Sequence, residues 1–90
     1  MNYTSDELQT IEDMAALFYS YKEIAIVLEV DVEEFKALMR LEEGNAYSRY
    51  QKGWITSDMS IRKSLLESAV NGSSPAQMML MELNKENKNG

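Results

Sequence analysis

Residues 21–35 decide the fold of this chain, and they read YKEIAIVLEVDVEEF. Ser20 and Glu23 have the spacing of a capping box, and Asp31 and Glu34 repeat that spacing. A polar cap followed three residues later by an acidic side chain marks the start of a helix. The stretch therefore predicts two short helices joined by a turn of about three residues, which is a helix-turn-helix.

The apolar residues of this stretch fit such a motif. Ile24, Leu28, Val30 and Phe35 should supply the shared core, and Ala25 should lie where the two helices cross most closely. A compact helical bundle of another kind could produce the same pattern. Glu29 departs from the usual motif, because many such turns carry glycine there to reach a left-handed backbone, and another residue costs about 1 kcal/mol.

Toward the N-terminus, Thr4 and Glu7 form a third capping box, which predicts a helix over 5–19. Its inward side chains should be Leu8, Ile11, Met14, Ala15 and Phe18. The second helix of the helix-turn-helix, with Phe35, Leu38 and Met39 inward, should be stopped by Gly44-Asn45. The whole motif is expected over about 20–43.

The region 45–83 should be helical with one interruption. Ala46, Tyr47, Tyr50 and Trp54 fit one helical face, and we expect a break near Gly53 because glycine weakens a helix. Ile61, Leu65, Leu66 and Ala69 mark a further helix ending at Asn71-Gly72. Ser74 and Pro75 should open the last helix as cap and first residue.

The last helix should pack through Ala76, Met79, Leu80 and Leu83, and the polar stretch 84–90 should be disordered. The predicted fold class is therefore all-α. We expect a single domain over 1–83, a small helical bundle of five to six helices with the helix-turn-helix near its N-terminus.

Composition argues against catalysis. The chain has neither cysteine nor histidine, so the commonest metal ligands and the usual neutral-pH base are missing, and no glycine-rich phosphate loop occurs. We expect no enzyme, no catalytic or metal-binding residue and no cofactor. No signal peptide and no apolar run long enough to span a bilayer is visible, which predicts a cytoplasmic protein without a membrane partner.

The order of these features resembles the small terminase subunits of tailed phages and related mobile elements. The resemblance covers about residues 10–83 and rests on Glu23-Ile24-Ala25, on Tyr50-Gln51-Lys52-Gly53 and on the segment 69–76, AVNGSSPA. It implies a homeodomain-like helix-turn-helix that recognises double-stranded DNA, a homo-oligomer, and a large terminase subunit as partner in genome packaging. The chain departs from that family in its short length and in Met78, Met79 and Met81.

Charge is the objection to simple DNA binding, since the net charge is −6. Residues 1–44 carry 3 basic and 11 acidic side chains, whereas 45–90 carry 6 basic and 4 acidic ones. Glu33 and Glu34 lie on the presumed recognition helix. The candidate DNA-binding residues are Lys22, Lys36, Arg40, Arg49 and Lys52.

Two functions remain open at this point. If those five basic residues converge on one face, a DNA-reading module is favoured; if they scatter, a helix-turn-helix fold used only for protein contacts or oligomerisation is favoured. Met78 and Met81 are left over from the packing face of the last helix, so they predict an oligomer or partner interface. Methionine also fills gaps in cores, which is the alternative.

Overall fold

The computed structural model describes the backbone of residues 2–89 and the side chains of residues 2–87. In this part of the chain there are helices and no strands, which confirms the all-α class. The five helices are α1 (Ser5–Ala16), α2 (Tyr21–Leu28), α3 (Val32–Arg40), α4 (Asn45–Val70) and α5 (Ser74–Asn89). Helices α2 and α3 with their short turn form the predicted helix-turn-helix.

The chain divides into two compact units between Ser57 and Asp58, where the sequence predicts one domain over 1–83. The N-terminal unit holds α1, α2, α3 and the first half of α4. The C-terminal unit holds the second half of α4 together with α5. Helix α4 is thus shared by both units.

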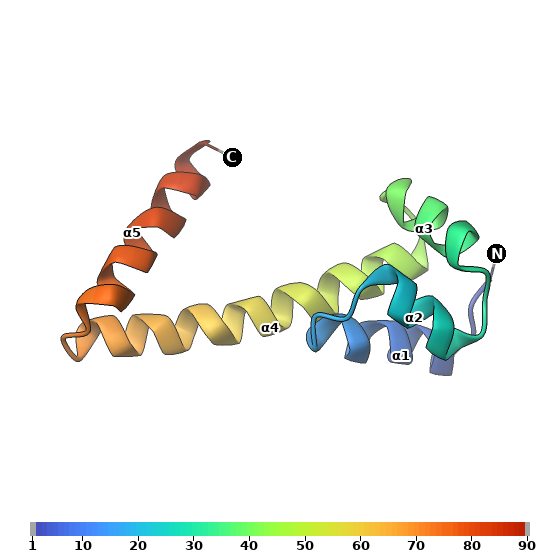
Figure 1. The fold of residues 1–90 in the computed structure, drawn as a ribbon, viewed down its shortest axis with the longest axis horizontal. Coiled ribbons are helices and arrows are strands. Elements are labelled where there is room, and N and C mark those ends of the chain that lie inside the picture. Colours follow the sequence, from blue (N-terminus) through green and yellow to red (C-terminus); the bar gives the residue numbers. More distant parts are fainter. Residues whose placement is uncertain (1, 90) are drawn as a thin grey trace. The chain divides into compact units, whose positions relative to one another are not determined.

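The N-terminal unit is built around the predicted core, and Figure 1 shows its first three helices gathered around the beginning of α4. Ile24, Ala25 and Phe35 are fully buried or nearly so, as expected. The rings of Tyr3 and Tyr21 each meet Phe35 edge-on, with centroids 6.3 Å apart. The buried cluster comprises Ile11, Ile24, Ala25, Phe35, Met39 and Ala46.

The three predicted caps all form. The side chains of Thr4, Ser20 and Asp31 each accept a hydrogen bond from the backbone N–H three residues further on. At Thr4 and Ser20 the capping box is complete, because the cap's own N–H donates a hydrogen bond to the glutamate carboxylate. Each bond satisfies a donor that a helix N-terminus otherwise leaves unpaired.

The turn of the helix-turn-helix has the left-handed geometry usual for the motif, although its sequence carries glutamate where glycine is common. Glu29 caps α2 in the left-handed region, with φ 59° and ψ 39°. Its N–H and that of Val30 bond to carbonyl groups in the last turn of α2. The chain therefore makes the turn with glutamate where glycine would be free of strain.

Two helices end earlier than the sequence predicts. Helix α1 ends at Ala16 rather than near 19, because Phe18 turns the chain with a φ of 62° so that Ser20 can cap α2. Phe18 is consequently 45% exposed rather than inward, and its ring lies edge-on to Trp54. Helix α3 ends at Arg40, and the loop that follows takes left-handed backbone at both Glu42 and Gly44.

The expected break near Gly53 is absent, since α4 runs unbroken from Asn45 to Val70 (Figure 1). Gly53 allows α4 to approach α1 closely and does not form a turn. A β-carbon on Gly53 would collide with the carbonyl oxygen of Glu12 in α1 and would lie 3.2 Å from the β-carbon of Ala15. A nearby hydrogen bond from the Ser57 hydroxyl to the Ala16 carbonyl joins the same two helices.

The C-terminal unit has a thin core. Ala69 of α4 and Ala76 of α5 are buried, and Leu65, Leu80 and Leu83 are half-buried. Small side chains at the crossing let the two helices pack closely, but each helix covers only one face of the other. As a result Met79, which the sequence predicts to pack inward, is 57% exposed, and Ile61 and Leu66 of α4 are 53% and 52% exposed.

The start and the end of α5 also differ from expectation. Ser73 rather than Ser74 is the cap, because its hydroxyl accepts a 3.3 Å hydrogen bond from the Ala76 N–H. The Gln77 side chain donates to the Ala69 carbonyl at 3.0 Å, which links the first turn of α5 to the end of α4. The predicted disordered stretch 84–90 is helical up to Asn89, and Gly90 lies outside the described residues.

Within the described residues, no helix has the length and apolar character needed to cross a membrane.

Candidate nucleic-acid and protein-binding surfaces

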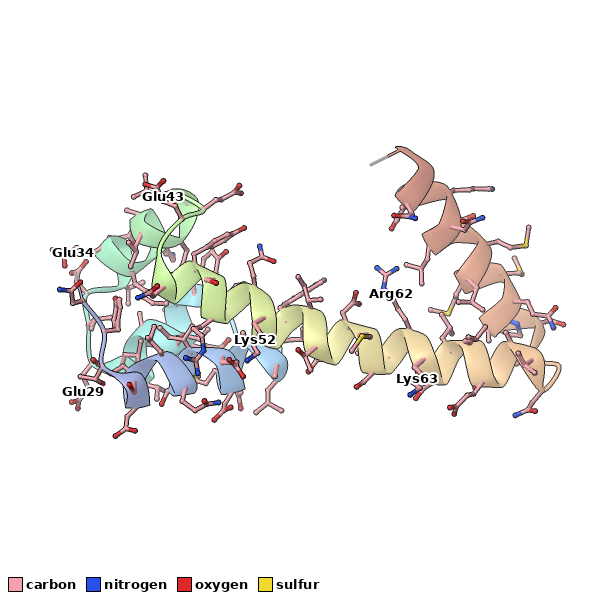
Figure 2. The ribbon with its side chains drawn as sticks, turned by 180° about the vertical axis from the view of Figure 1, so that it is seen from behind. Glu29, Glu34, Glu43, Lys52, Arg62 and Lys63 are labelled. Atoms are coloured by element: carbon pink, nitrogen blue, oxygen red, sulfur yellow. The ribbon has the colours of Figure 1, made fainter. Side chains whose placement is uncertain are left out.

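Two of the five candidate DNA-binding residues are held by one carboxylate. Arg49 and Lys52 both lie on α4, one turn apart, and both reach Glu12 on α1 (Lys52 is labelled in Figure 2). The Arg49 Nε donates to Glu12 Oε1 at 2.7 Å, and the Lys52 Nζ lies 3.7 Å from the same oxygen. The Arg49 Nη2 also donates to Gln9 Oε1 at 2.8 Å.

This cluster stabilises the charged form of Glu12. The hydrogen bond from Arg49 is the main reason why the pKa of Glu12 lies below its ordinary value of 4.5, and the charges of Lys52 and Arg49 add to the effect. Partial desolvation of the carboxylate opposes it. The cluster therefore links α1 to α4, and its two cations are compensated within the N-terminal unit.

Two further candidates lie on α3, the presumed recognition helix. Lys36 faces Glu33 of the same helix, with 3.8 Å between the Nζ and Oε1 atoms, and its side chain is 30% exposed. Arg40, one turn further on, is exposed. Lys22, the fifth candidate, is exposed in the first turn of α2. Arg40 and Lys22 form no ion pair with any residue that the structure describes.

The structure thus distributes the five cations over three helices and pairs three of them with glutamates. The N-terminal unit contains these 5 basic residues against 11 acidic ones, so it carries the whole net charge of −6. Glu29, Glu34 and Glu43 are among its exposed carboxylates (Figure 2). The C-terminal unit is neutral, with 4 basic and 4 acidic residues.

The N-terminal unit also exposes an apolar groove, which the sequence reasoning missed. Met14 and Tyr19 from the α1 end, with Ile26 and Val27 from α2, line a hollow of about 430 Å³, and Glu23 is the charged residue in its wall. Ile26 and Val27 are 58% and 57% exposed. The expected inward positions of Ile24, Ala25 and Leu28 leave Ile26 and Val27 facing outward, but the sequence does not indicate that this pair lines a hollow.

The predicted interface methionines are exposed. Met78 and Met81 on α5 are 68% and 62% exposed, whereas Ala76, on the opposite side of the helix, is buried. They are therefore surface residues of the C-terminal unit and not gap-fillers in its core.

More apolar surface lies on α4 than the sequence reasoning identified. Met59, Leu66 and Val70 are all more than half exposed, and they recur at steps of seven and four along the helix. Met59 and Leu66 join Leu80 of α5 in lining a hollow of about 600 Å³, whose wall also includes Arg62 and Lys63. Figure 2 shows these two cations leaving α4 in different directions. Arg62 is paired with Asp58 at 2.8 Å.

In the described part of the chain, no group of three or more acidic side chains is arranged to hold a metal ion. Comparisons with models of known protein families, with curated proteins and with solved structures found no match. The surfaces described above are therefore the basis for inferring function.

Proposed function

We propose that the chain is a non-catalytic helix-turn-helix protein that self-associates through the apolar surface of its C-terminal unit. The observation that carries this proposal is the imbalance between core and surface in that unit. Two alanines are buried, whereas Met59, Ile61, Leu66, Val70, Met78, Met79 and Met81 are each more than half exposed. A piece of chain shorter than about 40 residues usually needs a disulfide, a metal or oligomerisation to be stable.

Charge supports the same proposal. The N-terminal unit carries −6, so two copies of it repel each other, whereas the neutral C-terminal unit lets copies approach. Exposed apolar side chains in such number are typical of interaction sites. The pairing of Arg49, Lys52 and Lys36 with glutamates favours protein contacts over a basic surface for a phosphate backbone.

The test is light scattering after size exclusion over a range of concentrations. The wild-type chain should exceed its monomer mass of 10.3 kDa, and Met78→Glu with Met81→Glu should reduce the assembled fraction while the helix content is kept. The matched control is Asn84→Glu with Asn87→Glu, which adds the same charges at exposed polar positions of α5. A wild-type chain that stays monomeric at every concentration would refute self-association.

A second candidate function is DNA recognition of the kind that the terminase resemblance implies, with a large terminase subunit as partner. The observation in its favour is the helix-turn-helix itself, whose turn geometry at Glu29 matches the motif and whose α3 exposes Arg40. Anisotropy with duplex DNA should then show micromolar or weaker affinity that increases as salt falls. Lys36→Glu with Arg40→Glu should abolish it, and an unchanged affinity would exclude α3 as the reading helix.

A further inference from the structure

The structure contains a ridge and a groove that have opposite charge. Met78, Met81 and Lys85 follow one another at steps of three and four along α5, so they form a ridge on the side opposite the buried Ala76. The Lys85 ammonium has one ion-pair partner among the described side chains, Glu82 at 3.7 Å. Both of those side chains are about two-thirds exposed or more, so the pair is weak and free to rearrange.

The groove is the hollow between the end of α1 and α2 described above. Its walls are Met14, Tyr19, Ile26 and Val27, and its charged wall residue is the Glu23 carboxylate. Glu23 is held ionised, because the Ser20 N–H bonds to it and lowers the pKa of its carboxyl below the ordinary value. The hollow is therefore lined by four apolar side chains and one negative charge, within a unit that carries −6.

We infer that the ridge Met78–Met81–Lys85 of one copy docks into the α1–α2 groove of a second copy. This inference rests on the self-association proposed above and names the surface that receives α5. The two methionines would cover Ile26 and Val27, and Lys85 would exchange Glu82 for Glu23 of the other copy. Methionine suits such a contact because its unbranched side chain adapts to an irregular groove.

Charge selects this arrangement over a symmetric one. A groove placed against a second groove would bring two copies of the −6 unit together, and a ridge placed against a second ridge would oppose two Lys85 side chains. A ridge in a groove pairs opposite charges and covers both apolar surfaces at once. The contact is heterologous, so an open assembly keeps one free groove at one end and one free ridge at the other unless a ring closes.

A heterologous contact makes a specific prediction for mixed variants. Ile26→Glu with Val27→Glu blocks the groove and leaves the ridge, whereas Met78→Glu with Met81→Glu blocks the ridge and leaves the groove. Each variant alone should be a monomer, and an equimolar mixture should form a dimer of about twice the 10.3 kDa chain mass by light scattering. The dimer should stop there, because its two remaining faces are blocked.

The control variant is Ala37→Glu with Leu41→Glu, which adds the same charge to exposed positions of the N-terminal unit outside the groove. It should assemble as the wild type does. If the groove variant alone still assembles, or if the mixture stays monomeric while the wild type assembles, the docking inference is wrong and self-association stands. A wild type that never assembles overturns both.

A second measurement does not depend on disruptive charges. The chain has no cysteine, so single cysteines report one contact at a time. Val27→Cys and Met81→Cys, mixed in equal amounts under mild oxidation, should give the mixed disulfide dimer well above the roughly twofold excess over each homodimer that random pairing produces. Yields at that random ratio would contradict the docking of ridge into groove, and Met81→Cys homodimers in excess would indicate a symmetric contact between ridges.

Discussion

At Gly53, helix propensity and tertiary packing predict opposite effects of an alanine substitution on stability. In an isolated helix glycine is less favourable than alanine by about 1 kcal/mol, so Gly53→Ala should stabilise an exposed helix. Here the added β-carbon would meet the Glu12 carbonyl oxygen of the neighbouring helix. The backbone of α1 cannot rotate away as a side chain could.

We therefore predict that Gly53→Ala lowers the free energy of unfolding by about 1–3 kcal/mol or more, as overpacking does. Urea denaturation followed by tryptophan fluorescence measures it. Ser48→Ala, at an exposed site of the same helix within the N-terminal unit, should change the value by about 0.5 kcal/mol or less. An increase in stability for Gly53→Ala would mean that α1 and α4 do not approach each other at this point.

Local rules predicted the residues whose role depends on their immediate neighbours. The caps at Thr4, Ser20 and Asp31 could be predicted because each depends on a few consecutive residues. The left-handed turn at Glu29 could be expected from the motif but not from the residue itself. The function of Gly53 could not, because its steric partner, Glu12, lies 41 positions earlier in the chain. A glycine alone does not distinguish a break from a close approach.

At the scale of the elements, α1 and α4 are joined by a charged cluster as well as by close packing. Glu12 accepts from Arg49 and lies near Lys52, and its pKa is lowered from 4.5 in the folded state. A carboxyl whose pKa is depressed by folding adds stability above its unfolded pKa and loses that contribution as the pH falls through its folded pKa. The cluster should therefore stabilise the fold at neutral pH and fail in acid.

We predict that Glu12→Gln is less stable than the wild type at pH 7 and that the difference vanishes as the pH falls below the folded pKa of Glu12. Thermal melts across the pH range from 7 down to 3 measure both proteins. Glu23, whose pKa is also lowered, remains in both, so its contribution cancels from the comparison. A difference that stays constant with pH would show that the side-chain shape, and not the charge, of Glu12 matters.

The basic candidates could be identified from the sequence, but their surroundings could not. Arg49 and Lys52 are candidates for DNA binding because of their charge. Their ion pairs with Glu12 depend on how α4 lies against α1, which the sequence does not show. Lys36 and Glu33 are three apart on a helix, so that pairing was predictable in principle. Ile26 and Val27 face outward as the helical pattern implies, whereas the hollow that they line with the end of α1 depends on the same tertiary packing.

For the whole molecule, the division into two units predicts that the stability of the C-terminal unit depends on self-association more than that of the N-terminal unit does. The N-terminal unit buries Ile11, Ile24, Phe35 and Met39 almost completely, whereas the C-terminal unit buries two alanines. A core of large side chains stabilises a unit far more than two buried methyl groups do.

We predict that a fragment of residues 1–60 folds alone, melts cooperatively and stays monomeric at concentrations where the full chain assembles. Circular dichroism and light scattering on both proteins test this. An unfolded fragment would mean that the N-terminal unit needs the rest of α4 to fold. A fragment that assembles would show that the self-association surface lies in the N-terminal unit, contrary to the proposal.

The aromatic contacts have a further consequence for spectroscopy. Trp54, the one tryptophan, touches Phe18, and all five tyrosines and both phenylalanines also lie at or before position 50. The C-terminal unit therefore contributes nothing to absorbance at 280 nm, to intrinsic fluorescence or to the near-ultraviolet dichroism of aromatic rings. Optical unfolding curves at those wavelengths describe the N-terminal unit alone, and far-ultraviolet dichroism is needed to follow α5. A fragment released from the end of the chain would pass unseen through an absorbance detector set at 280 nm.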